Sequence, residues 1–248
     1  MNILEIPIVR RLYPSLVRRY LMLIGRYKID ININNFIFEI DIRESIERKT
    51  YFLKNYEQHR MKYLIKNSLK IKSNILIDVG ANIGFYSILL SKNFDYIYSY
   101  EPNNRNFNIL TKNILKNNLQ DKINTFNYGL GERKETLKGS SRNKGELIQT
   151  SGFAISENNK DGEDVLIHKG DEVLSFRNKV ITVKIDVEGF EFFVLKGLIE
   201  LLKNNHCYLQ VEIWDKNKDI VYQLLDKLNY KKIGFIDGDT YFSNIKIN

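Results

Sequence analysis

The stretch Ile75-Leu-Ile-Asp-Val-Gly-Ala-Asn-Ile-Gly-Phe85 combines an apolar strand, a glycine turn and the start of a helix. The apolar run of residues 75–79 is typical of a strand buried on both faces of a parallel sheet. Gly80 allows a sharp turn, and Gly84 allows a ligand or the next helix to approach, because neither residue has a Cβ. Residues 83–91 predict a helix whose first turn presents unpaired N–H groups. The pattern predicts a doubly wound α/β fold with a ligand site at this turn.

A second strand, residues 96–101, ends in Glu101, about 20 residues beyond the glycine turn. An acid at that place can accept both hydroxyls of a ribose. The spacing Gly80-x-x-x-Gly84 is not the Gly-x-Gly-x-x-Gly of dinucleotide enzymes, and Asp78 at the tip of the first strand would repel a pyrophosphate. S-adenosylmethionine fits better, because it joins a nucleoside to an amino acid and a sulfonium without a phosphate.

Five motifs follow one another along the chain: DVGANIG, YSYEPNN, NYGLGE, VKIDVEGFEFFVLKG and LQVEIWD. In this order and at these spacings they resemble the FkbM-type family of S-adenosylmethionine-dependent methyltransferases, over roughly residues 50–245. The resemblance implies a class I methyltransferase fold, which is a Rossmann-like seven-stranded sheet with an antiparallel last strand. It also implies O-methylation, often of sugars or polyketide-type hydroxyls.

The expected cofactor site lies at the tips of the first strands. Its residues are Glu57, Asp78, Gly80, Ala81, Asn82, Gly84, Glu101, Asn103, Tyr128, Gly129 and Asp186. Residues 127–129 are expected beside the adenine. Tyr56-Glu57 is similar to a Tyr-Glu pair that precedes the glycine turn in the family, and Glu57 could meet the ammonium group of the methionine moiety. The alternatives are a solvated carboxylate at a helix end for Glu57 and a helix cap for Asn103.

The expected chemical centre is a group of acids at the tips of two later strands. Asp186 lies near the end of the strand of residues 180–187 and precedes Glu188, while Glu212 and Asp215 lie at the end of the next strand. Methyl transfer is an in-line displacement that needs a positioned nucleophile and, for a hydroxyl, removal of a proton. Asp186 is the first candidate base, with Glu188 and Glu212 as further catalytic candidates.

A metal ion is the alternative use of these carboxylates. Asp186, Glu212 and Asp215 could hold Mg²⁺, which would bind and acidify a pair of hydroxyls. Clustered carboxylates also raise one another's pKa, which suits a base without a metal. The sequence leaves both mechanisms open. His168 is a further candidate base, but a surface histidine is the preferred interpretation.

The composition of the 248 residues fits one large α/β domain with additions. The net charge of +8 would suit nucleic acid, an anionic membrane or an acidic substrate, yet no basic block with interleaved aromatics is present. Cys207 is the single cysteine, which excludes an internal disulfide and a cysteine-based zinc site. No secretory signal or apolar run of about 18 residues is found, so the expected location is the cytoplasm.

Residues 1–50 are predicted to form an N-terminal extension to the methyltransferase domain of residues 51–248. Ser15 is a candidate helix cap. The apolar residues that follow it on one helical face are Leu16, Val17, Tyr20, Leu21 and Ile24. A basic amphipathic helix can lie on the cytoplasmic face of an anionic membrane, or pack on its own domain or on a second subunit in a dimer. Residues 27–43 predict a β-hairpin that turns at Asn34-Asn35.

The remaining segments predict a helical region at residues 44–71 and a third strand at residues 123–130. Glycine, serine and asparagine interrupt residues 131–178, which predicts an irregular insertion that covers the active site and sets the choice of acceptor. Within it, residues 163–168 are extended and can pair as a hairpin.

The sequence therefore predicts a cytoplasmic S-adenosylmethionine-dependent O-methyltransferase acting on a small acceptor, with a sugar or glycan precursor as the expected acceptor. One alternative is an RNA or DNA methyltransferase, although neither an Asn-Pro-Pro-Tyr-type motif nor a Pro-Cys dipeptide is present. The other is a binding protein that kept the fold without the chemistry. The intact Asp78, Gly80, Gly84, Glu101 and Asp186 argue against the second alternative.

Overall fold

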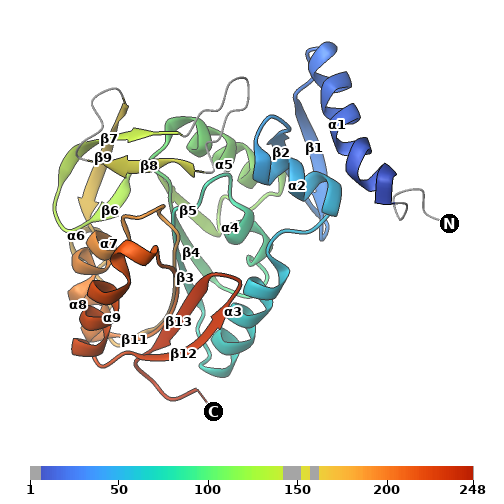
Figure 1. Cartoon of the computed structure of the whole chain (residues 1–248). Coiled ribbons are helices and arrows are strands. Elements are labelled where there is room, and N and C mark those ends of the chain that lie inside the picture. Colours follow the sequence, from blue (N-terminus) through green and yellow to red (C-terminus); the bar gives the residue numbers. More distant parts are fainter. Residues whose placement is uncertain (1–6, 142–151, 157–161, 248) are drawn as a thin grey trace.

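The computed structural model describes residues 7–141, 152–156 and 162–247, and its largest element is a seven-stranded sheet (Figure 1). The strands, in spatial order, are β5 (Ile123–Phe126), β4 (Tyr96–Tyr100), β3 (Ile75–Val79), β10 (Val180–Ile185), β11 (His206–Glu212), β13 (Asp239–Ser243) and β12 (Lys231–Ile236). Only β13 runs antiparallel to its neighbours in this sheet. The strand order reverses between β3 and β10, so the predicted doubly wound sheet with an antiparallel last strand is confirmed.

Helices cover both faces of the large sheet, because alternate residues of a buried strand point to opposite sides. Every residue of β3 is buried. Ile75, Ile77 and Val79 share an apolar cluster with α7 (Glu191–Gly197), α8 (Ile199–Asn204) and α9 (Lys218–Lys227). Leu76 belongs to a second cluster with α3 (Gln58–Lys70), α4 (Phe85–Leu89) and α5 (Asn104–Lys116). The carboxyl ends of the strands are left for a ligand site between these layers.

Several predicted helices are shorter or divided. The region of residues 44–71 forms α2 (Ser45–Leu53) and α3, and Lys54 and Glu57 between them have left-handed φ values of 51° and 39°. After β10 the chain forms two short helices, α7 and α8, which meet at Leu198. The last helix begins with the short turn η3 (Asp215–Asn217) before α9.

A second sheet occupies much of the segment expected to be irregular. Its strands, in spatial order, are β6 (Gly129–Gly131), β9 (Glu163–Lys169), β7 (Glu135–Ser140) and β8 (Ala154–Ser156), and α6 (Gly170–Val173) follows β9. The prediction of one strand over residues 123–130 is wrong, because the chain leaves β5 at Phe126 and enters this second sheet at Gly129. Gly139 weakens the strand pattern in the sequence, yet a Cβ there would lie 2.1 Å from the ring of Phe153.

The N-terminal part contains α1 (Pro7–Leu23) and the predicted hairpin, formed by β1 (Lys28–Ile33) and β2 (Phe36–Asp41). Asn34 and Asn35 have φ values of 51° and 68°, as a tight two-residue turn requires. Phe38 and Ile40 of the hairpin belong to the apolar cluster of α3, α4 and α5. The division of the chain at residue 50 stays a prediction.

Two asparagines bind the outer edge of β2: Asn113 of α5 and Asn117, which caps the C-terminal end of that helix. Asn117 Oδ1 accepts the N–H of Ile37 at 2.8 Å, and Asn117 Nδ2 donates to the Ile37 carbonyl at 2.7 Å. Asn113 Oδ1 accepts the N–H of Glu39 at 2.7 Å. These side chains supply the hydrogen bonds that another strand would otherwise make, so the edge of the hairpin is satisfied.

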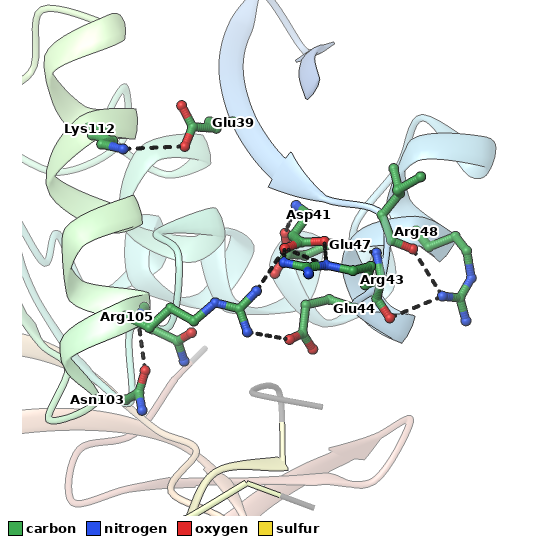
Figure 2. A network of polar contacts seen from close by, with 11 residues as sticks. Glu39, Asp41, Arg43, Glu44, Glu47, Arg48, Asn103, Arg105 and Lys112 are labelled. Atoms are coloured by element: carbon green, nitrogen blue, oxygen red, sulfur yellow. Dashed lines mark hydrogen bonds and ion pairs between the residues drawn. The ribbon is translucent and has the colours of Figure 1, made fainter. Parts of the chain in front are cut away.

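A buried ionic network joins the hairpin to the start of α5 (Figure 2). Asp41 is completely buried and pairs with Arg43 at 2.6 Å and with Arg105 at 2.8 Å. Arg105 also pairs with Glu44 at 3.3 Å. Glu47 accepts the N–H of Asp41, and burial raises the pKa of Glu47 to about 8. Since Arg105 lies in the first turn of α5, the network fixes this helix to the N-terminal part of the chain.

The helix α1 lies on the outer side of the hairpin (Figure 1). It begins at Pro7, so the predicted cap at Ser15 is wrong; proline is tolerated in the first turn of a helix. Leu21 packs on the apolar cluster, whereas Leu16, Tyr20 and Leu23 are 60%, 62% and 86% exposed. Among the helices that the structure describes, none is long and apolar enough to cross a bilayer. The cytoplasmic location stays a prediction.

Candidate active site

A pocket opens at the carboxyl ends of β3, β4 and β10, beside the glycine turn. Six predicted site residues line it: Gly80, Asn82, Glu101, Gly129, Asp186 and Glu188. Its other lining residues include Tyr100, Asn106, Leu130, Phe153, Ile155 and Phe190. Two of these, Phe153 and Ile155, come from the segment 131–178, so that segment contributes to the pocket.

Glu101 follows β4 and is only 4% exposed, and both of its carboxylate oxygens accept backbone hydrogen bonds. The N–H of Asn82 donates to Oε2 at 2.8 Å, and the N–H of Asn103 donates to Oε1 at 2.9 Å. Burial raises the pKa of Glu101 to about 7. Each oxygen keeps a second lone pair, so the carboxylate can accept two further O–H donors from the pocket.

The two glycines of the turn have different roles. Gly80 has a φ of 82°, and a Cβ on it would lie 1.9 Å from the carbonyl oxygen of Asp186, so a larger residue would separate β3 from the loop after β10. Gly84 has a φ of 95°, and a Cβ there would lie 2.7 Å from a methyl group of Leu110 on α5. Of the two uses expected for Gly84, the structure shows the close approach of a helix.

Several predicted cofactor residues lie behind the pocket and do not line it. Asp78 is fully buried and accepts the O–H of Ser87 at 2.6 Å. Ala81 is buried, and its N–H donates to the Tyr100 carbonyl at 3.0 Å. These residues shape the turn from within the fold.

Asn103 and Tyr128 also lie outside the lining. The Oδ1 of Asn103 accepts the N–H of Asn106 at 2.9 Å, which confirms the cap of α5. The ring of Tyr128 packs on His168 of β9, with 4.3 Å between the ring centroids. His168 is therefore a packing partner in the second sheet and does not belong to the acid group.

Glu57 belongs to a polar chain at the side of the sheet that carries α3 and α4. The O–H of Tyr86 donates to Glu57 Oε2 at 2.9 Å, and Gln210 Nε2 donates to Tyr86 Oη at 2.8 Å. Arg60 pairs with Glu57 at 3.2 Å and with the buried Asp239 at 3.4 Å. Glu57 is therefore no isolated helix-end carboxylate, and its contact with a cofactor stays a prediction.

The acid group forms around Asp186, as the sequence predicts. Carboxylate oxygens of Asp186, Glu188 and Glu212 lie within 4.8 Å of one another, so these three residues could hold a divalent cation. Asp215, expected in the same group, lies outside it. Glu188 has a left-handed φ of 52°, which turns the chain directly after the strand tip.

Lys184 is a buried cation next to this group of acids. Its ammonium lies 3.2 Å from Asp186 Oδ2 and 3.7 Å from Asp78 Oδ1, and its side chain is only 5% exposed. It also lies 4.6 Å from the centre of the Tyr86 ring. A buried ammonium between two acids stabilises their ionised forms, so Lys184 links the glycine turn to the acid group.

The pKa values of Asp186 and Glu212 are driven apart. Burial acts to raise the pKa of Asp186, but Lys184 and a hydrogen bond with Glu212 hold it below the usual range. The negative charge of Asp186, together with burial, raises the pKa of Glu212 to about 9. At neutral pH the pair therefore holds one proton, which lies mainly on Glu212.

A cleft continues outward from Glu212 between the start of α9 and the turn that joins β12 to β13. Its lining includes Trp214, Asp215, Lys216, Lys218, Tyr222, Lys232 and Phe235. Since Asp186 and Glu188 line the first pocket and Glu212 lines this cleft, the acid group lies where the two meet.

Sequence reasoning missed Lys184, although a signal was present. Residues two apart on a strand point to the same face, so Lys184 should lie beside Asp186. Arg60, Gln210 and Asp239 had no such signal, because they come from three elements that only the folded sheet brings together.

The chain is similar in sequence to known methyltransferases. A family model described as the methyltransferase FkbM domain matches residues 78–232, more than half of the chain. The hexuronic acid methyltransferase AglP of Haloferax volcanii is 26% identical over 178 residues, which cover 69% of this chain and 70% of the relative.

Solved structures give weaker likenesses. A methyltransferase FkbM from Methylobacillus flagellatus is 18% identical with a TM-score of 0.48, and the match covers 69% of this chain but 43% of that one. TYW2 from M. jannaschii, in complex with AdoMet, is 13% identical with a TM-score of 0.43, over 88% of this chain and 84% of that one. On the family match, the chain belongs to the FkbM family of S-adenosylmethionine-dependent methyltransferases.

Proposed function

We propose that the pocket beside the glycine turn binds S-adenosylmethionine, with Glu101 accepting the two ribose hydroxyls. The Glu101 carboxylate accepts one backbone N–H at each oxygen, from Asn82 and Asn103. Each oxygen keeps a further lone pair, which supports this role. Gly129 and Leu130 would border the adenine, and Glu57 would meet the ammonium group of the methionine moiety. The methyl group would then point toward Asp186.

The reaction that this arrangement supports best is transfer of the methyl group to a hydroxyl of an acceptor in the adjoining cleft. The observation that carries the proposal is the position of the acid group at the junction of pocket and cleft. Asp186, kept ionised by Lys184, would accept the proton that the acceptor hydroxyl loses. S-adenosylmethionine, when bound, would supply the methyl group and leave as S-adenosylhomocysteine. Glu212 carries the single proton that the Asp186–Glu212 pair holds at neutral pH, and its hydrogen bond orients the Asp186 carboxylate.

Mg²⁺ is the alternative to a metal-free base. Asp186, Glu188 and Glu212 offer three oxygens at suitable separations, so Glu188 replaces Asp215 in the expected ligand set. A bound ion would acidify the hydroxyl. Because Glu212 must lose its proton to bind the ion, Mg²⁺ would bind more tightly as the pH rises toward about 9.

A sugar hydroxyl is the proposed target. The relative from Haloferax volcanii is by its name a hexuronic acid methyltransferase, and the match extends over two thirds of both chains. The cleft also offers Trp214 and Phe235, whose flat apolar faces suit the C–H face of a sugar ring.

The variant Asp186→Asn tests this function. Methyl transfer from labelled S-adenosylmethionine to a panel of sugars should fall by about 10²–10⁴-fold, the range of a lost general base, while calorimetry shows cofactor affinity within a few-fold of the wild type. Adding EDTA separates the metal-free mechanism from the Mg²⁺ mechanism. Turnover that persists in Asp186→Asn would exclude this residue as the base.

A second proposal concerns the helix α1, which we propose contacts an anionic membrane. Leu16, Tyr20 and Leu23 form an exposed apolar face, and Arg19 and Arg26 are exposed near it. Apolar burial combined with cationic side chains is the usual basis of interfacial binding. The alternative is that a second copy of the chain covers this face of α1. Vesicle binding and dimer formation can be measured separately.

A further inference from the structure

The cleft beyond Glu212 carries a charge pattern that the methyl-transfer chemistry does not use. Lys216 lies in the turn η3, Lys218 begins α9, and Lys232 lies on β12 across the cleft. Among residues 7–141, 152–156 and 162–247, no ion pair includes any of these three lysines. By contrast, the neighbouring Lys231 pairs with Asp226 at 2.9 Å. The cleft thus presents three lysine ammonium groups that no carboxylate of the described residues neutralises in an ion pair.

Aromatic rings hold two of these lysines over the cleft. The ammonium of Lys216 lies 5.3 Å from the centre of the Trp214 ring. The ammonium of Lys232 lies 5.5 Å from the Phe235 ring and 5.7 Å from the Tyr222 ring. Phe235 is 59% exposed, so an apolar face remains open beside the charges. Cations beside open ring faces suit a ligand that has both an apolar face and an anionic group.

The two ends of the cleft have opposite charge. The inner end meets the carboxylates of Asp186, Glu188 and Glu212, whereas the lysines outnumber Asp215 along the rest of the lining. Lys216 lies at the boundary, because a Cβ on Gly189 would be 3.2 Å from its ammonium. An anionic group is repelled from the inner end and attracted to the outer part, so it would fix which end of an acceptor reaches the methyl group.

We propose that the cleft selects sugar acceptors that carry an acidic group, which Lys216, Lys218 and Lys232 bind while a hydroxyl of the same sugar faces Asp186. The proposal rests on the proposed function and deepens it by naming the substrate class and the residues that recognise it. A carboxylate of a uronic acid and a phosphate ester share this chemistry.

The test is direct binding, measured without turnover, followed by kinetics. Saturation-transfer NMR with glucuronic acid, glucose 1-phosphate and glucose, in the presence of S-adenosylhomocysteine, should detect the two acidic sugars and not glucose. Comparing the two acids identifies which source of negative charge is preferred. Each of the changes Lys216→Met, Lys218→Met and Lys232→Met should weaken binding of the acidic sugar by about tenfold, the effect of one charge-assisted hydrogen bond.

Lys231→Met is the matched control, because Lys231 lies on the same strand as Lys232 and pairs outside the cleft. Equal binding of glucose and glucuronic acid, or acid binding that survives in the triple lysine variant, would overturn the proposal. Preferential binding of single-stranded RNA over the acidic sugars would also overturn it. Failure of the proposed function looks different: acidic sugars still bind through the lysines, but none is methylated.

Discussion

Glu101 has two roles that depend on the same carboxylate. It holds the N–H groups of Asn82 and Asn103, and it is proposed to accept the ribose hydroxyls. Its pKa of about 7 means that the ionised form, which accepts both hydroxyls, becomes dominant only above neutral pH. We therefore expect cofactor affinity to rise between pH 6 and pH 8.

The variant Glu101→Gln should remove this pH dependence and weaken cofactor binding by at least tenfold, because an amide can accept at one oxygen only. Calorimetric titration with S-adenosylmethionine at both pH values is the measurement. Glu200→Gln, on the exposed face of α8, is the control. Unchanged affinity in Glu101→Gln would show that the ribose binds elsewhere.

Lys184 is the residue on which the acid group depends for its charge. Lys184→Met leaves Asp78 buried without its cation, and loss of one partner of a buried pair costs about 3–5 kcal/mol. Without the ammonium the pKa of Asp186 should rise, so the acid limb of the pH–rate profile should move to higher pH. Urea unfolding and the rate profile measure the two effects.

The double variant Asp78→Asn, Lys184→Met separates the effect of Lys184 on stability from its effect on the pH–rate profile. Removing the buried carboxylate charge should restore part of the free energy of unfolding, while the shifted rate profile persists because Asp186 still lacks its cation. A rate profile that stays at the wild-type position would contradict this account of Lys184.

At the scale of elements, α1 combines exposed apolar residues with the exposed cations of Arg19 and, just beyond its end, Arg26. The triple variant Leu16→Ser, Tyr20→Ser, Leu23→Ser should abolish sedimentation with phosphatidylcholine vesicles that contain phosphatidylserine, and leave methyl transfer to soluble sugars unchanged. Ile220→Ser, an exposed apolar residue on α9, should keep vesicle binding. If the triple variant loses a dimer, and the wild type does not bind vesicles, a second copy of the chain covers this face of α1.

The hairpin illustrates how far an element is determined by local sequence. Alternation and Asn34-Asn35 predict both strands and the turn, because the backbone conformation depends on those residues alone. Its place on α5 does not follow from them. That place depends on Asn113 and Asn117, about 75–80 residues later, whose side chains bind the edge of β2.

At the scale of the whole molecule, several buried carboxylates make stability depend on pH. Folding raises the pKa of Glu47 to about 8, of Glu101 to about 7, of Glu212 to about 9 and of Asp239 to about 6. The folded chain therefore holds these protons more tightly than the unfolded chain. Their contribution to stability is fully present below the unfolded pKa of about 4 and is lost as the pH rises through 6–9.

We therefore expect the melting temperature to be higher at pH 5.5 than at pH 9, measured by calorimetry. Glu47 is surrounded by Asp41, Glu44 and Arg105 and is remote from the acid group, so Glu47→Gln tests the cause directly. This variant should show a smaller decrease between the two pH values than the wild type or Glu200→Gln. A melting temperature that rises with pH would contradict the assignment.

The fold was predictable because its signals are local and redundant. The strands β3, β4, β10 and β11 are mostly apolar or aromatic, and each is followed by a helix. The motif order also resembles a known family, so the order of the large sheet follows. In the second sheet, the sequence predicted the extended segment of β9. The other three strands were not predictable, because β6 and β8 have three residues each and β7 contains Gly139. Short strands are defined by their partners and not by their own composition.

For the candidate site, the sequence by itself determined which acids end the strands: Glu101, Asp186 and Glu212 follow from strand patterns, since every parallel strand ends at the same edge of the sheet. Only the tertiary structure decided which of them share space. It kept Asp186, Glu188 and Glu212 in one group, left the expected fourth member Asp215 in the cleft, and placed Lys184 between Asp78 and Asp186. The reason is that charge and pKa depend on distances across elements, and these are fixed only when the two apolar layers close on the sheet.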